Sequence, residues 1–154
     1  MSAGDANRAT DTGAGAPVLA ACACFNARSA ARAITDLYDR ALEPSGVRLT
    51  QFAILAVIQA RAAASMQTIA AELGLDPSTM TRTTRPLEDA GLVESRAGGD
   101  KRARELVLTA SGRKKAGECH ALWADAQREL RQKLGAEVFD RLVSDLGSVT
   151  RALR

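Results

Sequence analysis

Hydroxyl and guanidinium groups gather on one predicted helix near the middle of the chain. Asp76-Pro77 predicts where this helix begins, because Asp is a favoured N-cap residue and Pro a favoured first helical residue. The polar side of the helix then carries Ser78, Thr79, Thr81, Arg82 and Arg85. Such groups bind phosphate oxygens and base edges, and a helix N-terminus adds free N–H groups and a positive dipole end. An ordinary amphipathic helix with a solvated outer face has the same pattern, so the neighbouring elements must decide.

A second concentration of cations follows in a glycine-rich segment. Residues 96–115 contain seven basic and two acidic residues, an excess of +5 in a chain whose net charge is +3. A run of solvated charges is one interpretation. The other is a basic hairpin tip that contacts the minor groove and the phosphates of DNA. In that interpretation Arg102 enters the minor groove, and Asp100 accepts a hydrogen bond from its guanidinium. The phosphate contacts would come from Lys101 and Arg104.

Two short helices and a hairpin would position these groups. The first helix ends at Gly74, where a C-cap favours left-handed backbone, and its apolar face consists of Met66, Ile69, Ala70 and Leu73. The second helix begins after Asp76 and would bury Met80, Thr84 and Leu87, so the pair forms a helix-turn-helix. Alternation over 92–96 and 104–108 predicts two strands of a β-hairpin, or wing. Pro86 either bends the second helix or ends it near Arg85.

Longer helices flank this region. Residues 1–17 have almost nothing to bury and are predicted to be a disordered tail. A helix is predicted from Val18 until Pro44-Ser45-Gly46 ends it, and Thr50 is expected to cap the next one. After the hairpin, Thr109 should cap a long helix to about Leu134, and a last helix follows Gly135. The terminal helices carry apolar stripes that a small winged domain cannot cover alone, which indicates a dimer.

Several stretches together resemble the MarR (multiple antibiotic resistance regulator) family of bacterial transcription factors. They are LTQFAILAVI, TIAAELGLDPSTMTRTTRPLEDAGLV and RAGGDKRARELVLTASG, and the resemblance covers about residues 20–153. The Asp-x-Arg of the wing followed by a strand and Leu-Thr-x-x-Gly is its most specific part. A proline in this helix, like Pro86 here, also occurs in a subset of the family.

The resemblance implies a mainly α fold with a small β-hairpin wing, in a single winged helix-turn-helix domain over 18–154. Residues 18–48 and 110–154 would be the dimerisation helices, and 49–109 the DNA-binding region. A homodimer would bind double-stranded DNA at a palindromic operator, with recognition helices about 34 Å apart. It would most often be a repressor, released by a small ligand or an oxidant.

MarR-like regulators often bind small aromatic or anionic compounds between the dimer helices and the DNA-binding part. The candidate sensing residues are Phe25, Arg28, Tyr38, Phe52 and Trp123. The aromatic ones are equally explained as core side chains. Cys22 and Cys24 offer a second route, since a thiol near a helix N-terminus and Arg28 is more easily oxidised. Buried, unreactive cysteine is the alternative.

The residues present exclude most enzymes. The only histidine, His120, follows Cys119, and two adjacent helical side chains do not make a metal site, so no metal or cofactor is predicted. No nucleophile–base pair or phosphate-binding motif is found, and no enzyme activity is expected. The absence of a signal peptide and of a long apolar run favours a cytoplasmic protein with no membrane contact. A winged domain that binds protein remains the alternative, but it would have no need of a basic wing tip.

Overall fold

The computed structural model describes residues 15–98 and 104–153. The described residues divide into two units, the first ending at Ile34 and the second beginning at Thr35. In the first unit, helix α1 (Gly15–Ala21) is followed by a break at Cys22 and by the start of α2 (Ala23–Leu42). The sequence predicted a tail to residue 17 and one unbroken helix from Val18. The difference arises because the Cys22 amide donates to Leu19 O, 3.1 Å away, in a tighter turn. The side chain of Asn26 donates to Ala20 O and Cys22 O, at 2.8 and 3.0 Å, beside the backbone bond from the Asn26 amide to Cys22 O.

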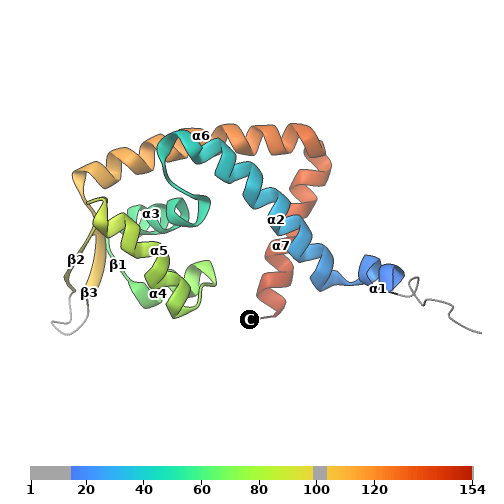
Figure 1. Ribbon diagram of the computed structural model, residues 1–154, viewed down its shortest axis with the longest axis horizontal. Coiled ribbons are helices and arrows are strands. Elements are labelled where there is room, and N and C mark those ends of the chain that lie inside the picture. Colours follow the sequence, from blue (N-terminus) through green and yellow to red (C-terminus); the bar gives the residue numbers. More distant parts are fainter. Residues whose placement is uncertain (1–14, 99–103, 154) are drawn as a thin grey trace, which may run out of the picture. The chain divides into compact units, whose positions relative to one another are not determined.

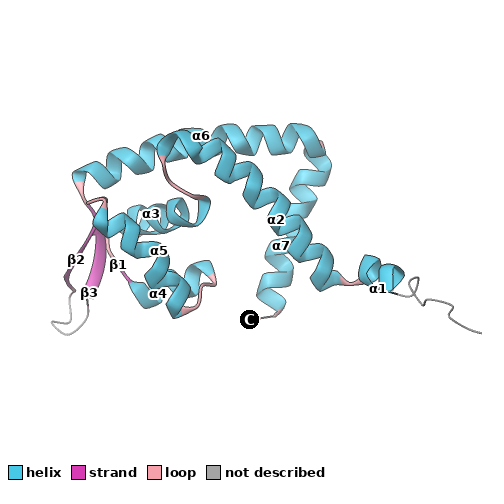
Figure 2. Ribbon diagram, viewed as in Figure 1, coloured by secondary structure: helices cyan, strands magenta, loops and turns pink. Residues whose placement is uncertain are grey.

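The second unit is mainly helical with one small sheet, which confirms the predicted fold class (Figures 1 and 2). After α2 come a 3-10 turn η1 (Glu43–Ser45), α3 (Leu49–Arg61), β1 (Ala64–Ser65), α4 (Met66–Leu73), α5 (Pro77–Asp89), β2 (Val93–Ala97), β3 (Arg104–Leu108), α6 (Ala110–Leu134) and α7 (Ala136–Ala152). The strands are antiparallel in the order β1-β3-β2. The hairpin was predicted, but β1, only two residues long, was not.

The core surrounds α3, which contacts α4, α5, α6 and β3. Its largest fully buried side chains are aliphatic or sulfur-containing, with one threonine: Leu42, Ile54, Leu55, Ile58, Ile69, Met80, Thr84, Leu87 and Cys119. Gly112 lets α6 approach the chain that precedes β2, because a Cβ there would overlap the carbonyl oxygen of Leu92. The apolar faces of α4 and α5 pack against this same core, as the spacing of their apolar residues predicted.

Most predicted helix ends are observed. Asp76 caps α5, Thr109 caps α6, and Gly74 ends α4 with a left-handed φ of 66°. Thr50 does not cap α3. The helix begins at Leu49, two residues earlier than a cap at Thr50 would give, and the Leu49 amide donates to Asp39 Oδ1 of α2 at 2.7 Å. Gln51 Oε1 also accepts from the Arg48 amide at 2.9 Å, so the start of α3 is held by one local acceptor and by one from another helix, which local sequence cannot indicate.

Helix α5 continues through Pro86 to Asp89, so it does not end at Arg85. Among the described residues no single helix is long and apolar enough to cross a membrane. Helix α2 with η1 and helix α3, which are bent relative to each other, reach the length and apolar composition of a membrane span only when they are counted together.

Candidate nucleic-acid interface

The N-terminus of α5 is organised around the carboxylate of Asp76. Its Oδ1 accepts from the amides of Ser78 and Thr79, at 3.0 and 2.9 Å. The two hydroxyls donate to the same carboxylate, each at 2.6 Å. These hydroxyl and amide hydrogen bonds hold the pKa of the Asp76 carboxyl well below its usual range. The Asp76 carboxylate is therefore ionised at neutral pH and holds the first turn of α5 through four hydrogen bonds.

The outward face of α5 matches the predicted polar set. Ser78, Thr81, Arg82 and Arg85 are exposed, and Thr79 is half-buried. Thr81 Oγ1 donates to Pro77 O at 2.9 Å, and Arg85 lies 4.0 Å from Asp89 in an exposed pair. In the described residues Arg82 forms no ion pair. Both guanidinium groups are thus available to an external anion.

The inward face of α5 holds the helix against the core. Met80, Thr84 and Leu87 are all buried, as predicted. Thr84 is only 1% exposed, and its hydroxyl has no hydrogen-bond partner in the described part of the chain. A buried hydroxyl without a partner lowers stability. The polar face of α5 is therefore presented on a helix whose other face is fully packed.

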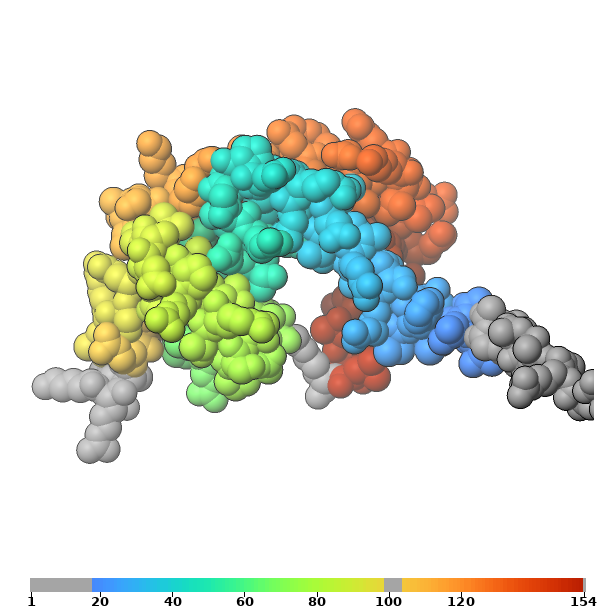
Figure 3. Space-filling view, in the orientation of Figure 1, coloured from blue at the N-terminus to red at the C-terminus, as the bar shows by residue number. Residues whose placement is uncertain are grey.

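The wing begins directly after α5. Leu92 N donates to Leu87 O at 2.9 Å, and α5 contacts β2. In the hairpin, Val93 pairs with Leu108 and Ala97 with Arg104. Arg104 reaches across to β2, where its Nε donates to Ser95 Oγ at 2.8 Å. Figure 3 shows α4 and α5 in green to yellow beside the strands, on one continuous surface.

Three predicted contact residues, Asp100, Lys101 and Arg102, lie outside the described residues. Their expected position at the wing tip rests on the sequence. Of the six others, five lie on α5 and Arg104 lies at the start of β3, paired with Ala97 of β2.

The predicted sensing residues do not form one cluster. Cys22 lies at the break between α1 and α2 and is half-buried, whereas Cys24 and Arg28 are exposed on α2. Tyr38 is buried, donates to Gln127 Oε1 of α6, and has its pKa raised by burial. Phe52 is a core residue, and its ring lies 6.3 Å from that of Trp123.

His120, which was not among the predicted sensing residues, lies beside the aromatic pair of Phe52 and Trp123. The His120 ring lies 5.4 Å from the Trp123 ring. His120 also borders a cavity of about 380 Å³ between α3 and α6, lined by Phe52, Ala56, Gln59, Ala60, Ala116, Gly117 and His120. The helical spacing of small residues in α3 and in α6 could have indicated two surfaces with little side-chain bulk. Only the packing of the two helices shows that these surfaces face each other.

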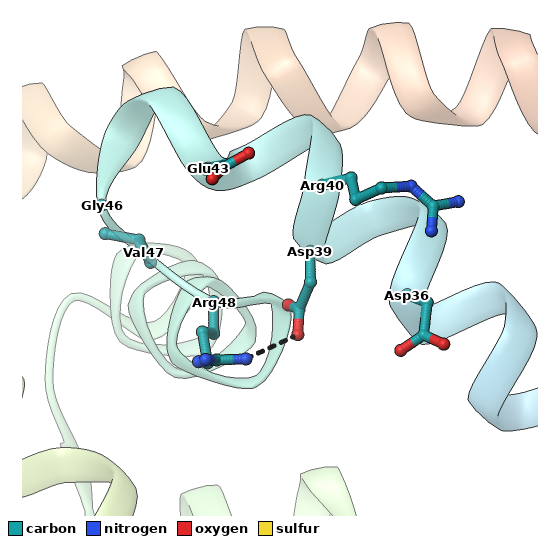
Figure 4. Close-up of a pocket in the computed structure, with 7 residues that line it drawn as sticks. All are labelled: Asp36, Asp39, Arg40, Glu43, Gly46, Val47 and Arg48. Carbon is teal, nitrogen blue, oxygen red and sulfur yellow. Dashed lines mark hydrogen bonds and ion pairs between the residues drawn. The ribbon is translucent and has the colours of Figure 1, made fainter.

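A second cavity, of about 430 Å³, lies at the junction of α2, η1 and α3 (Figure 4). It is lined by Asp36, Asp39, Arg40, Glu43, Gly46, Val47 and Arg48, and the Arg48 guanidinium donates to Asp39 Oδ2 at 3.4 Å. Its charges are mixed, and Asp39 is already used to cap α3. In the described ranges no group of His, Cys, Asp and Glu side chains could hold a metal ion. Cys119 is fully buried, and burial raises the pKa of its thiol.

Comparison with known proteins gives a consistent set of relatives. Residues 47–103 match the sequence model of the MarR family. The HTH-type transcriptional regulator YwoH of Bacillus subtilis (strain 168) is 32% identical over 100 residues, which are 65% of this chain and 73% of YwoH. The M. tuberculosis transcriptional regulator MosR, in a crystal structure with DNA, is 38% identical with a TM-score of 0.71, and the match covers 86% of this chain and 98% of MosR. CouR of Rhodococcus jostii RHA1, bound to p-coumaroyl-CoA, shares the fold, with a TM-score of 0.73 at 23% identity over 85% of this chain and 93% of CouR.

Proposed function

The chain belongs to the MarR family of DNA-binding transcriptional regulators, and we propose that it acts as a homodimeric repressor. In this proposal each protomer inserts α5 into the major groove at one half of a palindromic operator. A small-molecule ligand or an oxidant then releases the DNA. The cytoplasm is the compartment where such a regulator meets its operator.

The observation that carries the proposal is the exposed polar face of α5 on a fully packed helix. Arg82 and Arg85 are exposed, while Met80 and Leu87 on the opposite face are buried. A recognition helix needs this division, because base readout requires side chains held in register by a rigid support. Arg104, and by sequence Lys101 and Arg102, would add phosphate and minor-groove contacts.

The homodimer is supported by the exposed apolar side chains of α7. Val138, Val143, Leu146 and Val149 are 43–57% exposed, and no residue of this helix is buried. Exposed apolar faces of this size are typical of surfaces that another chain covers. Two-fold symmetry would then match a palindromic operator.

For a small aromatic effector we propose the cavity between α3 and α6. Phe52 and His120 border it and Ala56, Ala60 and Gly117 leave space for a flat ring. A Cβ added at Gly117 meets no atom within 4 Å, so this side of α6 faces open space. CouR, which shares the fold, was crystallised with p-coumaroyl-CoA.

An oxidant would act on Cys22 and Cys24 instead. The helix is interrupted at Cys22, and Cys24 is exposed, so peroxide can reach at least one thiol. Peroxide should lower DNA affinity of the native chain but leave a Cys22→Ser, Cys24→Ser variant unchanged. An equal response of both proteins would remove these cysteines from the sensing mechanism.

Fluorescence polarisation with the intergenic DNA beside the protein's own gene tests DNA binding. We expect specific binding that weakens with salt, with one dimer per palindrome. Arg82→Ala and Arg85→Ala should each weaken it by roughly tenfold if they contact bases. Arg102→Ala should weaken it several-fold.

Arg128→Ala is the matched control, because Arg128 is exposed on α6 and pairs with Asp125. Equal binding of specific and random DNA by the native chain, with no effect of the α5 variants, would contradict the recognition role of α5. The winged domain would then be better explained as a protein-binding module. In an effector screen, Gly117→Leu should abolish DNA release by compounds that bind the α3–α6 cavity.

A further inference from the structure

A small cavity lies at the root of the β2–β3 hairpin, where the wing meets α3 and α6. Its volume is about 270 Å³, and it is lined by Ile58, Gln59, Ala62, Arg96, Val107, Leu108 and Arg113. Residues from four elements or their ends thus meet there: α3, β2, β3 and α6. None of the lining residues belongs to α5, so the cavity is separate from the polar face assigned to DNA.

The charge of this cavity distinguishes it from the others found in the described residues. Arg96 and Arg113 line it together with the amide of Gln59, and no carboxylate is among the lining side chains. The cavity between α2 and α3 has three carboxylates beside its two guanidiniums, and another on α4 pairs Arg61 with Glu72. The remaining two have no Lys, Arg, Asp or Glu in their lining. An anion is therefore the group this cavity is suited to bind.

Both guanidiniums are held in place but keep donors for a ligand. Arg113 Nη1 donates to Leu108 O at 2.9 Å. Arg96 forms an ion pair with Glu94 and donates to Glu94 Oε1 through Nε, at 2.9 Å, and through Nη2. A guanidinium has five N–H donors, so most of those on Arg113 are left after this one contact. A carboxylate needs two to four donors in a fixed arrangement, and a fork of guanidinium N–H groups matches its geometry.

The floor of the cavity is apolar. Ile58 is fully buried, Leu108 is 6% exposed, and Val107 and Ala62 complete the wall. A hydrated inorganic ion or a DNA phosphate would leave this surface uncovered, whereas an organic acid would cover it with its carbon skeleton. The combination of cationic rim and apolar floor selects for a carboxylate on a compact hydrocarbon body.

We infer that the wing-root cavity formed by Arg96 and Arg113 over Ile58, Val107 and Leu108 binds a small organic monocarboxylate. The bound carboxylate bridges β2 and α6 and competes with Glu94 for the Arg96 guanidinium. This site is distinct from the α3–α6 cavity, although Gln59 borders both. Binding itself does not depend on the proposed function, because it requires no DNA.

Calorimetric titration of the full-length protein with benzoate tests the site, with neutral benzamide as the matched probe. We expect benzoate to bind and benzamide to bind at least roughly tenfold more weakly, because a charge-assisted hydrogen bond is lost. Arg113→Met and Arg96→Met, which keep most of the apolar stem, should each weaken benzoate binding by a similar factor. Arg128→Met should leave it unchanged. Amide chemical shifts of Ala62, Val107 and Leu108 should move on addition of benzoate.

Circular dichroism of both Met variants ensures that a loss of binding is not a loss of fold, and Arg96→Met does not touch the Arg113–Leu108 hydrogen bond. Equal binding of benzoate and benzamide, or unchanged affinity in both folded variants, would overturn the inference. So would shifts confined to residues around His120. If benzoate does not bind while Arg113→Met weakens DNA binding, the two guanidiniums are phosphate contacts and the inference is wrong.

Discussion

Helices α5 and α7 are both amphipathic, yet their apolar faces meet different environments. On α5, Leu87 is 2% exposed and Met80 is 1% exposed, because α3 and α4 cover them. On α7, Val143 and Leu146 are 57% and 48% exposed. The helix contacts α6, where Arg131 donates to Asp140 Oδ2 at 2.9 Å and lies over the Phe139 ring. One chain thus covers the apolar side of α5 but leaves the apolar side of α7 exposed.

Packing within the chain and packing between chains therefore have different roles in the two helices. The apolar side of α5, the proposed recognition helix, is packed within one protomer against α3 and α4. In the proposed homodimer the terminal helix would be stabilised by association, so the distance between the two recognition helices would depend on a surface that a ligand can alter.

The largest expected effect comes from placing charges on the open face of α7. Val143→Glu with Leu146→Glu should raise the dimer dissociation constant by at least roughly a hundredfold, since each apolar side chain contributes about 1.5–3 kcal/mol when buried. Light scattering should then give a mass near 16.2 kDa instead of twice that value. Ser144→Glu, half a turn away from Leu146 on the helix, is the control. A double variant that remains dimeric would show that α7 is not the interface.

A stability comparison in that monomeric background separates the two helices further. Leu87→Ala should lower the free energy of unfolding by about 2–5 kcal/mol in the native and in the monomeric protein alike, because its cavity forms within one chain. Val149→Ala should lower stability only in the dimer. Urea denaturation followed by circular dichroism measures both. An equal cost of Val149→Ala in the two backgrounds would place its contacts inside the protomer and remove the contrast.

The buried hydroxyl of Thr84 offers a change of opposite sign. Thr84→Val should raise the free energy of unfolding by about 1 kcal/mol, because it removes a polar group that has no partner in the core. Thermal denaturation measures the gain. Thr81→Val, on the exposed side of the same helix, should change stability little. If Thr84→Val lowers stability, the hydroxyl has a partner that α5 needs.

The smallest effect concerns the cap of α5 and its dependence on pH. The pKa of Asp76 is lowered in the folded protein, so its contribution to stability is complete above its unfolded pKa of about 4. That contribution is lost as the pH falls further, through the folded pKa. Asp76→Ala should therefore lower the melting temperature at pH 7, and the difference from the native chain should shrink below about pH 4.

Asp89→Ala is the control for this experiment, since Asp89 is exposed and lies 4.0 Å from Arg85. A melting-temperature difference for Asp76→Ala that stays constant to the lowest pH would contradict the role of the ionised cap.

Local signals in the sequence predicted the helix-turn-helix well. Asp76 with Pro77, Gly74 and Thr109 each act through hydrogen bonds or backbone angles within a few residues, so their types suffice to locate helix ends. The apolar spacing of Met80 and Leu87 likewise identified the buried face of α5. The resemblance to MarR regulators then indicated the family, which the comparisons confirm.

Features that join distant residues required the tertiary structure. Asp39 of α2 accepts from the first amide of α3, β1 pairs with β3 across 40 residues of chain, and Arg96 and Arg113 line one cavity at the wing root. The expected cap at Thr50 was wrong for this reason. Residue types and spacing determine local hydrogen bonds and which face is apolar, because both follow from the periodicity of the backbone. Which faces meet, and which cavity or uncovered surface results, depends on the packing of whole helices, and only the tertiary structure decides it.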